Sequence, residues 1–74
     1  MRNEAVNKIS QKTIYSYATC EFIYEFMGVL GLDQEEATRK LLQKASGLGQ
    51  DPIRLMFSMV SAAYNFLKSK GDME

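Results

Sequence analysis

Two glutamates, Glu21 and Glu25, are the first residues whose spacing could support chemistry. On a helix, residues four apart share a face, and paired carboxylates in that arrangement can exchange protons or bind a cation. Such a site also needs further inward-facing ligands or a basic partner, and the chain has no histidine and only one cysteine. We therefore interpret the pair as a solvated helix face. We expect no catalytic residue, no metal site and no cofactor.

The single cysteine, Cys20, cannot close a disulfide within the chain. The sequence places no histidine or nearby lysine beside it to lower its pKa. Cysteine in an apolar stretch commonly behaves as a small buried hydrophobic residue, and we interpret Cys20 in that way. Enzyme function is therefore not predicted.

Residues 46–51, SGLGQD, are glycine-rich and precede a predicted helix, where phosphate-binding loops also occur. They lack the glycine spacing and the Lys-Ser/Thr ending of a nucleotide-binding loop. Asp51 would also repel an anion at this position. A helix cap followed by a turn explains the segment better.

Charge and composition restrict the partners of this 74-residue chain, in which nine basic residues balance nine acidic ones. This balance gives no general attraction to nucleic acid or to an anionic membrane. The polar amino end is not a signal peptide, and two glutamates disfavour residues 14–32 as a membrane span. We expect one soluble, cytoplasmic domain covering residues 1–74.

Three helices are predicted, and no stretch alternates like a strand. The first covers residues 3–30 and ends at Gly31, although residues 1–12 are either its extension or a frayed tail. The second covers residues 34–45 and begins at the cap residue Asp33. The third covers residues 52–68, and residues 69–74 form a disordered tail. The fold class is therefore an all-α, compact three-helix bundle.

Two of these helices carry more apolar surface than a small bundle can bury. About two thirds of the circumference of residues 14–32 is apolar, which requires two separate covering surfaces. One is the rest of the chain, and we assign the other to a second copy, because two-fold dimers are the commonest closed assembly. The predicted interface consists of Tyr17, Cys20, Tyr24, Met27, Leu55, Met59, Ala62 and Phe66.

Gly28, inside the first predicted helix, costs about 1 kcal/mol relative to alanine. It either allows another helix to cross closely or is a tolerated weakness near the helix end.

The predicted function is that of a non-enzymatic protein–protein interaction module, acting as a homodimer or with a second protein partner. The alternative is a helix-turn-helix DNA-binding regulator built from the second and third helices. Against it, the third helix offers only Arg54 and Lys68 as basic side chains, and the turn of residues 46–51 is longer than usual for this motif.

Overall fold

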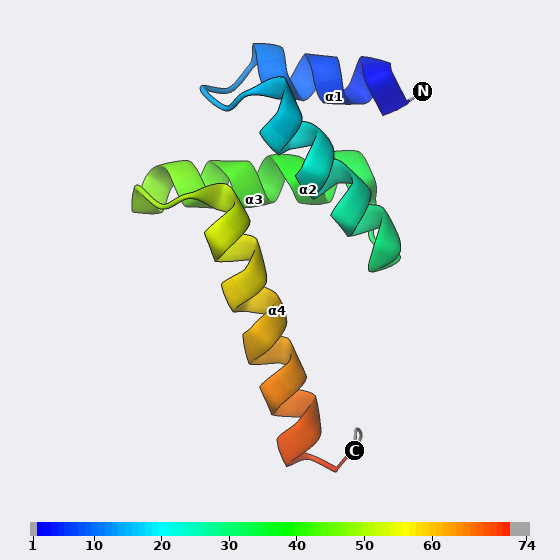
Figure 1. Ribbon diagram of the computed structural model, residues 1–74, viewed down its shortest axis with the longest axis vertical. Coiled ribbons are helices and arrows are strands. Elements are labelled where there is room, and N and C mark those ends of the chain that lie inside the picture. The colour runs from blue at the N-terminus through cyan, green and yellow to red at the C-terminus, as the bar shows by residue number, and fades with distance from the viewer. Residues whose placement is uncertain (1, 72–74) are drawn as a thin grey trace.

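The described residues form four helices, because a break after residue 11 divides the predicted first helix in two (Figure 1). The computed structural model describes residues 2–71. Its helices are α1 (Arg2–Gln11), α2 (Tyr17–Val29), α3 (Gln34–Leu48) and α4 (Pro52–Ser69). The predicted all-α class is confirmed for the described residues, whereas the predicted number of helices, three, is wrong.

Hydroxyl side chains explain the break between α1 and α2. Ser16 caps α2, since its side chain accepts a hydrogen bond from the Thr19 N–H at 3.3 Å. In the connection, the Thr13 hydroxyl accepts from the Tyr15 N–H at 3.2 Å, and the Ser10 hydroxyl donates to the Tyr15 carbonyl at 3.4 Å. Serine and threonine offer the backbone alternatives to helical hydrogen bonds in this way, and they are favoured at helix starts.

The break lets α1 turn back over α2 and fill the second apolar surface of that helix. Val6 is 0% exposed and Ile9 is 2% exposed, and both belong to one core cluster with Cys20, Ile23 and Met27 of α2. The sequence analysis assigned this flank of α2 to another copy of the chain. In the structure, the chain covers it with its own amino-terminal helix.

Helix α3 begins where the sequence predicts. The Asp33 carboxylate caps it by accepting a hydrogen bond from the Glu36 N–H at 3.1 Å. Leu41, Leu42 and Ala45 are buried along one side of the helix. Leu41 and Leu42 join Val6 and Ile9 of α1 in the core cluster.

Three helices are followed by a glycine with left-handed backbone, and these glycines are Gly31, Gly49 and Gly71. Gly31 has φ 76° after α2, and the Leu32 N–H donates to the Met27 carbonyl at 3.1 Å, which is a Schellman ending at the predicted glycine. Helix α3 continues to Leu48, beyond its predicted end at residue 45, and Gly49 then has φ 66°. The connection between α3 and α4 is therefore shortened to residues 49–51.

Helix α4 starts at a strong cap and packs against the body only along its first turns. The Asp51 carboxylate accepts hydrogen bonds from the Ile53 N–H at 2.9 Å and from the Arg54 N–H at 3.2 Å. Leu55 and Met56 are buried. The first half of α4 is thus part of the core that α1, α2 and α3 form.

Candidate interaction surface

The second half of α4 projects from the body of the molecule. Every residue of the segment 61–69, which we call distal α4, is exposed. Figure 1 shows this part of α4 extending beyond the other three helices, and the molecule measures 42 Å along its longest axis but 16 Å along its shortest. Distal α4 is a single helix without a neighbouring element in the described chain.

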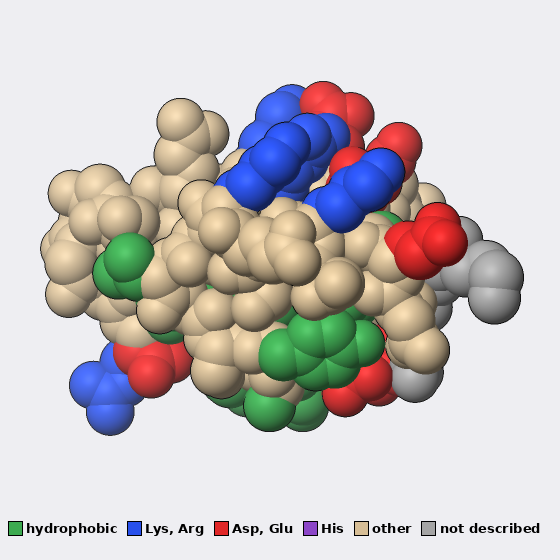
Figure 2. Space-filling view, turned by 90° about the horizontal axis from the view of Figure 1, so that it is seen from above, with side chains coloured by type: hydrophobic (Ala, Val, Ile, Leu, Met, Phe, Trp, Pro, Cys, Tyr) green, Lys and Arg blue, Asp and Glu red, His purple; other side chains and the backbone are tan. Residues whose placement is uncertain are grey.

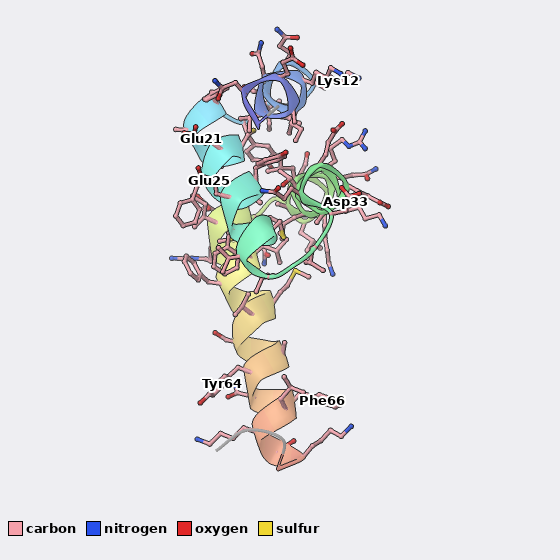
Figure 3. The ribbon with its side chains drawn as sticks, turned by 90° about the vertical axis from the view of Figure 1, so that its right-hand side faces the viewer. Lys12, Glu21, Glu25, Asp33, Tyr64 and Phe66 are labelled. Atoms are coloured by element: carbon pink, nitrogen blue, oxygen red, sulfur yellow. The ribbon has the colours of Figure 1, made fainter. Side chains whose placement is uncertain are left out.

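Distal α4 carries a broad apolar face. At about 100° per residue, the apolar residues of distal α4, together with Met59 and Val60 just before it, cover roughly half of the helix circumference. Phe66 is 61% exposed, Met59 46%, Tyr64 43% and Leu67 39%. Figure 3 shows Tyr64 and Phe66 projecting to opposite sides of α4, beyond the other helices. We define the α4 apolar face as Met59, Val60, Ala62, Ala63, Tyr64, Phe66 and Leu67.

The opposite side of distal α4 is polar and contains no acidic residue. It consists of Ser61, Asn65, Lys68 and Ser69. The Lys70 ammonium lies 5.1 Å from the centroid of the Phe66 ring, within the range of a cation–π contact. The helix therefore presents an uncharged apolar face and keeps its positive charge at its carboxyl end.

Aromatic contacts hold the amino-terminal part of α4, which we call its root, against α2. The Phe57 ring lies 6.4 Å from Phe22 at an interplanar angle of 56° and 6.0 Å from Phe26 at 70°. Tilted and edge-on ring pairs at these distances are favourable. They hold α4 in a direction that carries its distal segment away from the core.

The structure separates the predicted interface residues. Cys20, Met27 and Leu55 are 0%, 5% and 8% exposed, so the chain buries them within its own core. Tyr24 is partly buried against that core. In this fold, these four side chains have little or no surface to offer to a second molecule.

The remaining predicted interface residues lie on the surface, in two places. Tyr17 begins α2, is 38% exposed and donates a hydrogen bond from its hydroxyl to the Asn3 carboxamide oxygen at 3.4 Å. Met59, Ala62 and Phe66 lie together on α4, and all three are exposed. The structure therefore gathers three of the four exposed residues of the predicted set on α4.

Ala63, Tyr64 and Leu67 are surface residues that the sequence did not indicate. The predicted helix lengths carried no signal, because the first predicted helix, residues 3–30, is longer than the third, residues 52–68. Helix α4 has 18 residues and α2 has 13, which at about 1.5 Å per residue leaves the end of α4 well beyond its neighbour.

The candidate chemical groups Cys20, Glu21 and Glu25 all lie on α2. Glu21 is half-buried and Glu25 is exposed on α2, on the outer side of that helix (Figure 3). Among residues 2–71, no group of three or more His, Cys, Asp or Glu side chains could hold a metal ion. Burial raises the pKa of the Cys20 thiol, whose sulfur lies 4.0 Å from the Thr13 hydroxyl.

Gly28 is approached closely by a side chain of its own chain. A Cβ atom at Gly28 would lie 2.6 Å from Nε2 of Gln34. The same Nε2 donates a hydrogen bond to the Tyr24 carbonyl at 3.0 Å. Of the two interpretations offered for this glycine, close approach is correct, but the approaching group is the first residue of α3 and not a second molecule.

Within the described chain, no helix combines the length and hydrophobicity needed to cross a membrane. Comparison with models of protein families, with curated proteins and with solved structures finds no match.

Proposed function

We propose that this chain is a non-enzymatic protein–protein interaction module that forms a homodimer through the α4 apolar face. The observation that supports the proposal is the exposure of the whole of residues 61–69 beside a continuous apolar face. Apolar patches of this kind on small proteins commonly mark sites of association.

The lack of tertiary packing around distal α4 favours association. In proteins, most helix stability comes from tertiary packing of an apolar face. Distal α4 continues an 18-residue helix and needs no nucleation of its own, but all of its residues are exposed. Covering its apolar face would contribute about 25 cal/mol for each square ångström of apolar surface removed from water. A partner helix would therefore stabilise the segment and hide its exposed aromatic rings.

A second copy of α4 suits this face in both shape and charge. Ala63 lies at the middle of the apolar face and Ala62 at one edge of it. A small side chain at the middle allows two helices to approach closely. In an antiparallel pair, Lys68 and Lys70 of one copy lie at the opposite end from those of its partner. This arrangement separates the like charges and places Phe66 of each helix toward Met59 of the other.

Sedimentation equilibrium tests the proposal with two variants of equal charge. Phe66→Glu places a carboxylate on the apolar face, and Asn65→Glu places the same carboxylate on the polar face. We expect a dimer for the natural chain and for Asn65→Glu, and a monomer for Phe66→Glu. A monomer for all three proteins at high micromolar concentration would refute self-association, and equal masses for the two variants would refute the role of this face.

One observation supports DNA binding as a second candidate function. The connection of residues 49–51 between α3 and α4 has the length of a helix-turn-helix turn, which removes one objection raised by the sequence. The exposed polar side of α4 still provides only Arg54 and Lys68 as basic side chains.

Fluorescence anisotropy with a labelled DNA duplex, at low and moderate salt, separates the two candidates. Salt-sensitive binding that is lost in Arg54→Gln would support DNA recognition. The interaction-module proposal expects no such binding.

A further inference from the structure

A groove of about 540 Å³ lies between the carboxyl end of α1 and α3. Its lining residues come from residues 8–15 and from α3, and neither α2 nor α4 contributes one. It is therefore separate from the α4 apolar face. Its volume falls within the range of about 300–1,000 Å³ that is usual for small-molecule sites.

The inner surface of the groove is mainly apolar. Ile9 and Leu42, which are 2% and 1% exposed, close its floor. Ile14 and Tyr15, from the connection after α1, form one wall, and Ile14 is 86% exposed. Covering such an exposed isoleucine with an apolar ligand removes its surface from water and is therefore favourable.

The rim of the groove is basic. Lys8, Lys12 and Arg39 line it together with one acidic residue, Glu35. The Arg39 guanidinium lies 3.9 Å from the Glu35 carboxylate, at the outer limit of an ion pair, and both side chains are largely exposed. Figure 3 shows Lys12 on the side of the molecule where α3 lies, and Figure 2 shows lysine and arginine side chains gathered on one side of the molecule.

From these observations we infer that the groove binds an amphiphilic carboxylate, a molecule with an aliphatic body and a single anionic head, such as a medium-chain fatty acid. The body lies against Ile14 and Tyr15, and the head lies among the lysine ammonium groups and the Arg39 guanidinium. Hydrogen bonds between such cations and a carboxylate are stronger than those between neutral groups.

The distal α4 of a second copy suits the groove less well. It would bring Lys68 and Lys70 toward a rim that already holds Lys8 and Lys12, and like charges repel. The charge of the rim therefore favours a small anion over the helix that completes the proposed dimer.

NMR titration of the ¹⁵N-labelled full chain with decanoate, below its micelle concentration, tests the inference. We expect saturable shifts confined to residues 8–15 and 39–47. Decyltrimethylammonium has the same chain length with a cationic head, and we expect at least about tenfold weaker binding for it. Equal binding of the two amphiphiles, shifts centred on distal α4, or preference for anionic phospholipid vesicles over monomeric decanoate would each overturn the inference.

Substitution of Gly47 tests the position of the ligand. Gly47 lines the groove, and a Cβ atom there meets nothing within 4 Å, so Gly47→Leu can fill the groove without disturbing α3. We expect Gly47→Leu to fold, as judged by circular dichroism, and to lose decanoate binding. Unchanged affinity in this folded variant would overturn the inference.

A pair of double variants tests the charge of the rim. Lys8→Gln with Lys12→Gln removes two charges from the groove, and Lys40→Gln with Lys44→Gln removes two from the outside of α3. We expect decanoate to bind about tenfold more weakly to the Lys8/Lys12 double variant and almost unchanged to the Lys40/Lys44 double variant. Equal losses in the two pairs would mean that overall charge, and not the groove, attracts the anion.

Discussion

The Phe57 ring lies 6.0 Å from the Phe26 ring at an interplanar angle of 70°, and this contact holds the root of α4 against α2. Beyond this root the helix leaves the body, and residues 61–69 are exposed. The chain therefore contains two regions that differ in how their apolar side chains are packed. The body packs around one core cluster, whereas distal α4 presents an exposed apolar face.

Phe57 and Phe66 are expected to respond differently to truncation. Phe57→Ala removes the ring contacts at the root and should lower the free energy of unfolding by about 1–3 kcal/mol, since the ring is only half-buried. Phe66→Ala should leave the stability of the dilute monomer almost unchanged and weaken dimerisation. Urea denaturation at low micromolar concentration measures the first effect, and sedimentation measures the second. Equal loss of monomer stability in both variants would contradict this division.

Much of the fold follows from local sequence signals. The cap at Asp33 and the glycine ending at Gly31 lie where the sequence predicts them. Each depends on neighbouring residues only, so the sequence is sufficient to find them.

The path of the amino-terminal part could not be predicted, because it depends on tertiary packing. Helical spacing continues from Val6 through Ile9 to Cys20, and a straight helix satisfies that pattern. Hydrogen bonds at Thr13 and Ser16 stop it instead, and α1 then covers the α2 flank. This one loop therefore decides that Cys20 and Met27 of the predicted interface lie in the core. The groove beside it was missed for the same reason.

Gly28 and Gln34 should be energetically coupled. In the natural chain, Gly28→Ala gains about 1 kcal/mol in helix propensity. The new methyl group displaces the Gln34 carboxamide and removes a hydrogen bond worth roughly the same amount. We therefore expect Gly28→Ala to change the free energy of unfolding of the natural chain by close to zero. In a Gln34→Ala background, the same substitution should stabilise the fold by about 1 kcal/mol. A double-mutant cycle by urea denaturation tests this, and equal effects in the two backgrounds would contradict it.

Thr38 should be a site of easy stabilisation. It is 0% exposed, and its hydroxyl has no hydrogen-bond partner in the described part of the chain. Thr38→Val keeps the shape of the side chain and removes this polar group, which should raise the free energy of unfolding by about 1 kcal/mol. Thr38→Ser is the control, since it keeps the hydroxyl, loses a buried methyl group and should destabilise. Thermal denaturation distinguishes the two, and a less stable valine variant would show that the hydroxyl has a favourable role.

Cys20 should make stability depend on alkaline pH. Burial raises the pKa of its thiol in the folded chain, so the unfolded chain ionises first as the pH rises. The contribution of the neutral thiol to the free energy of unfolding is fully present below the unfolded pKa of about 8.5. It is lost progressively as the pH rises from there through the folded pKa. The free energy of unfolding should therefore fall more steeply with alkaline pH in the natural chain than in Cys20→Ala. Parallel pH profiles for the two proteins would contradict the burial of this thiol.

Hydrogen exchange of the distal α4 amides, followed against protein concentration, tests the central claim most directly. Helix hydrogen bonds without tertiary packing open readily, and packing against a partner slows that opening. We predict fast exchange over residues 61–69 in dilute solution, strong protection at concentrations that populate the dimer, and fast exchange at every concentration in Phe66→Glu. Protection that is independent of concentration and unchanged in Phe66→Glu would contradict the claim that a second copy covers this helix.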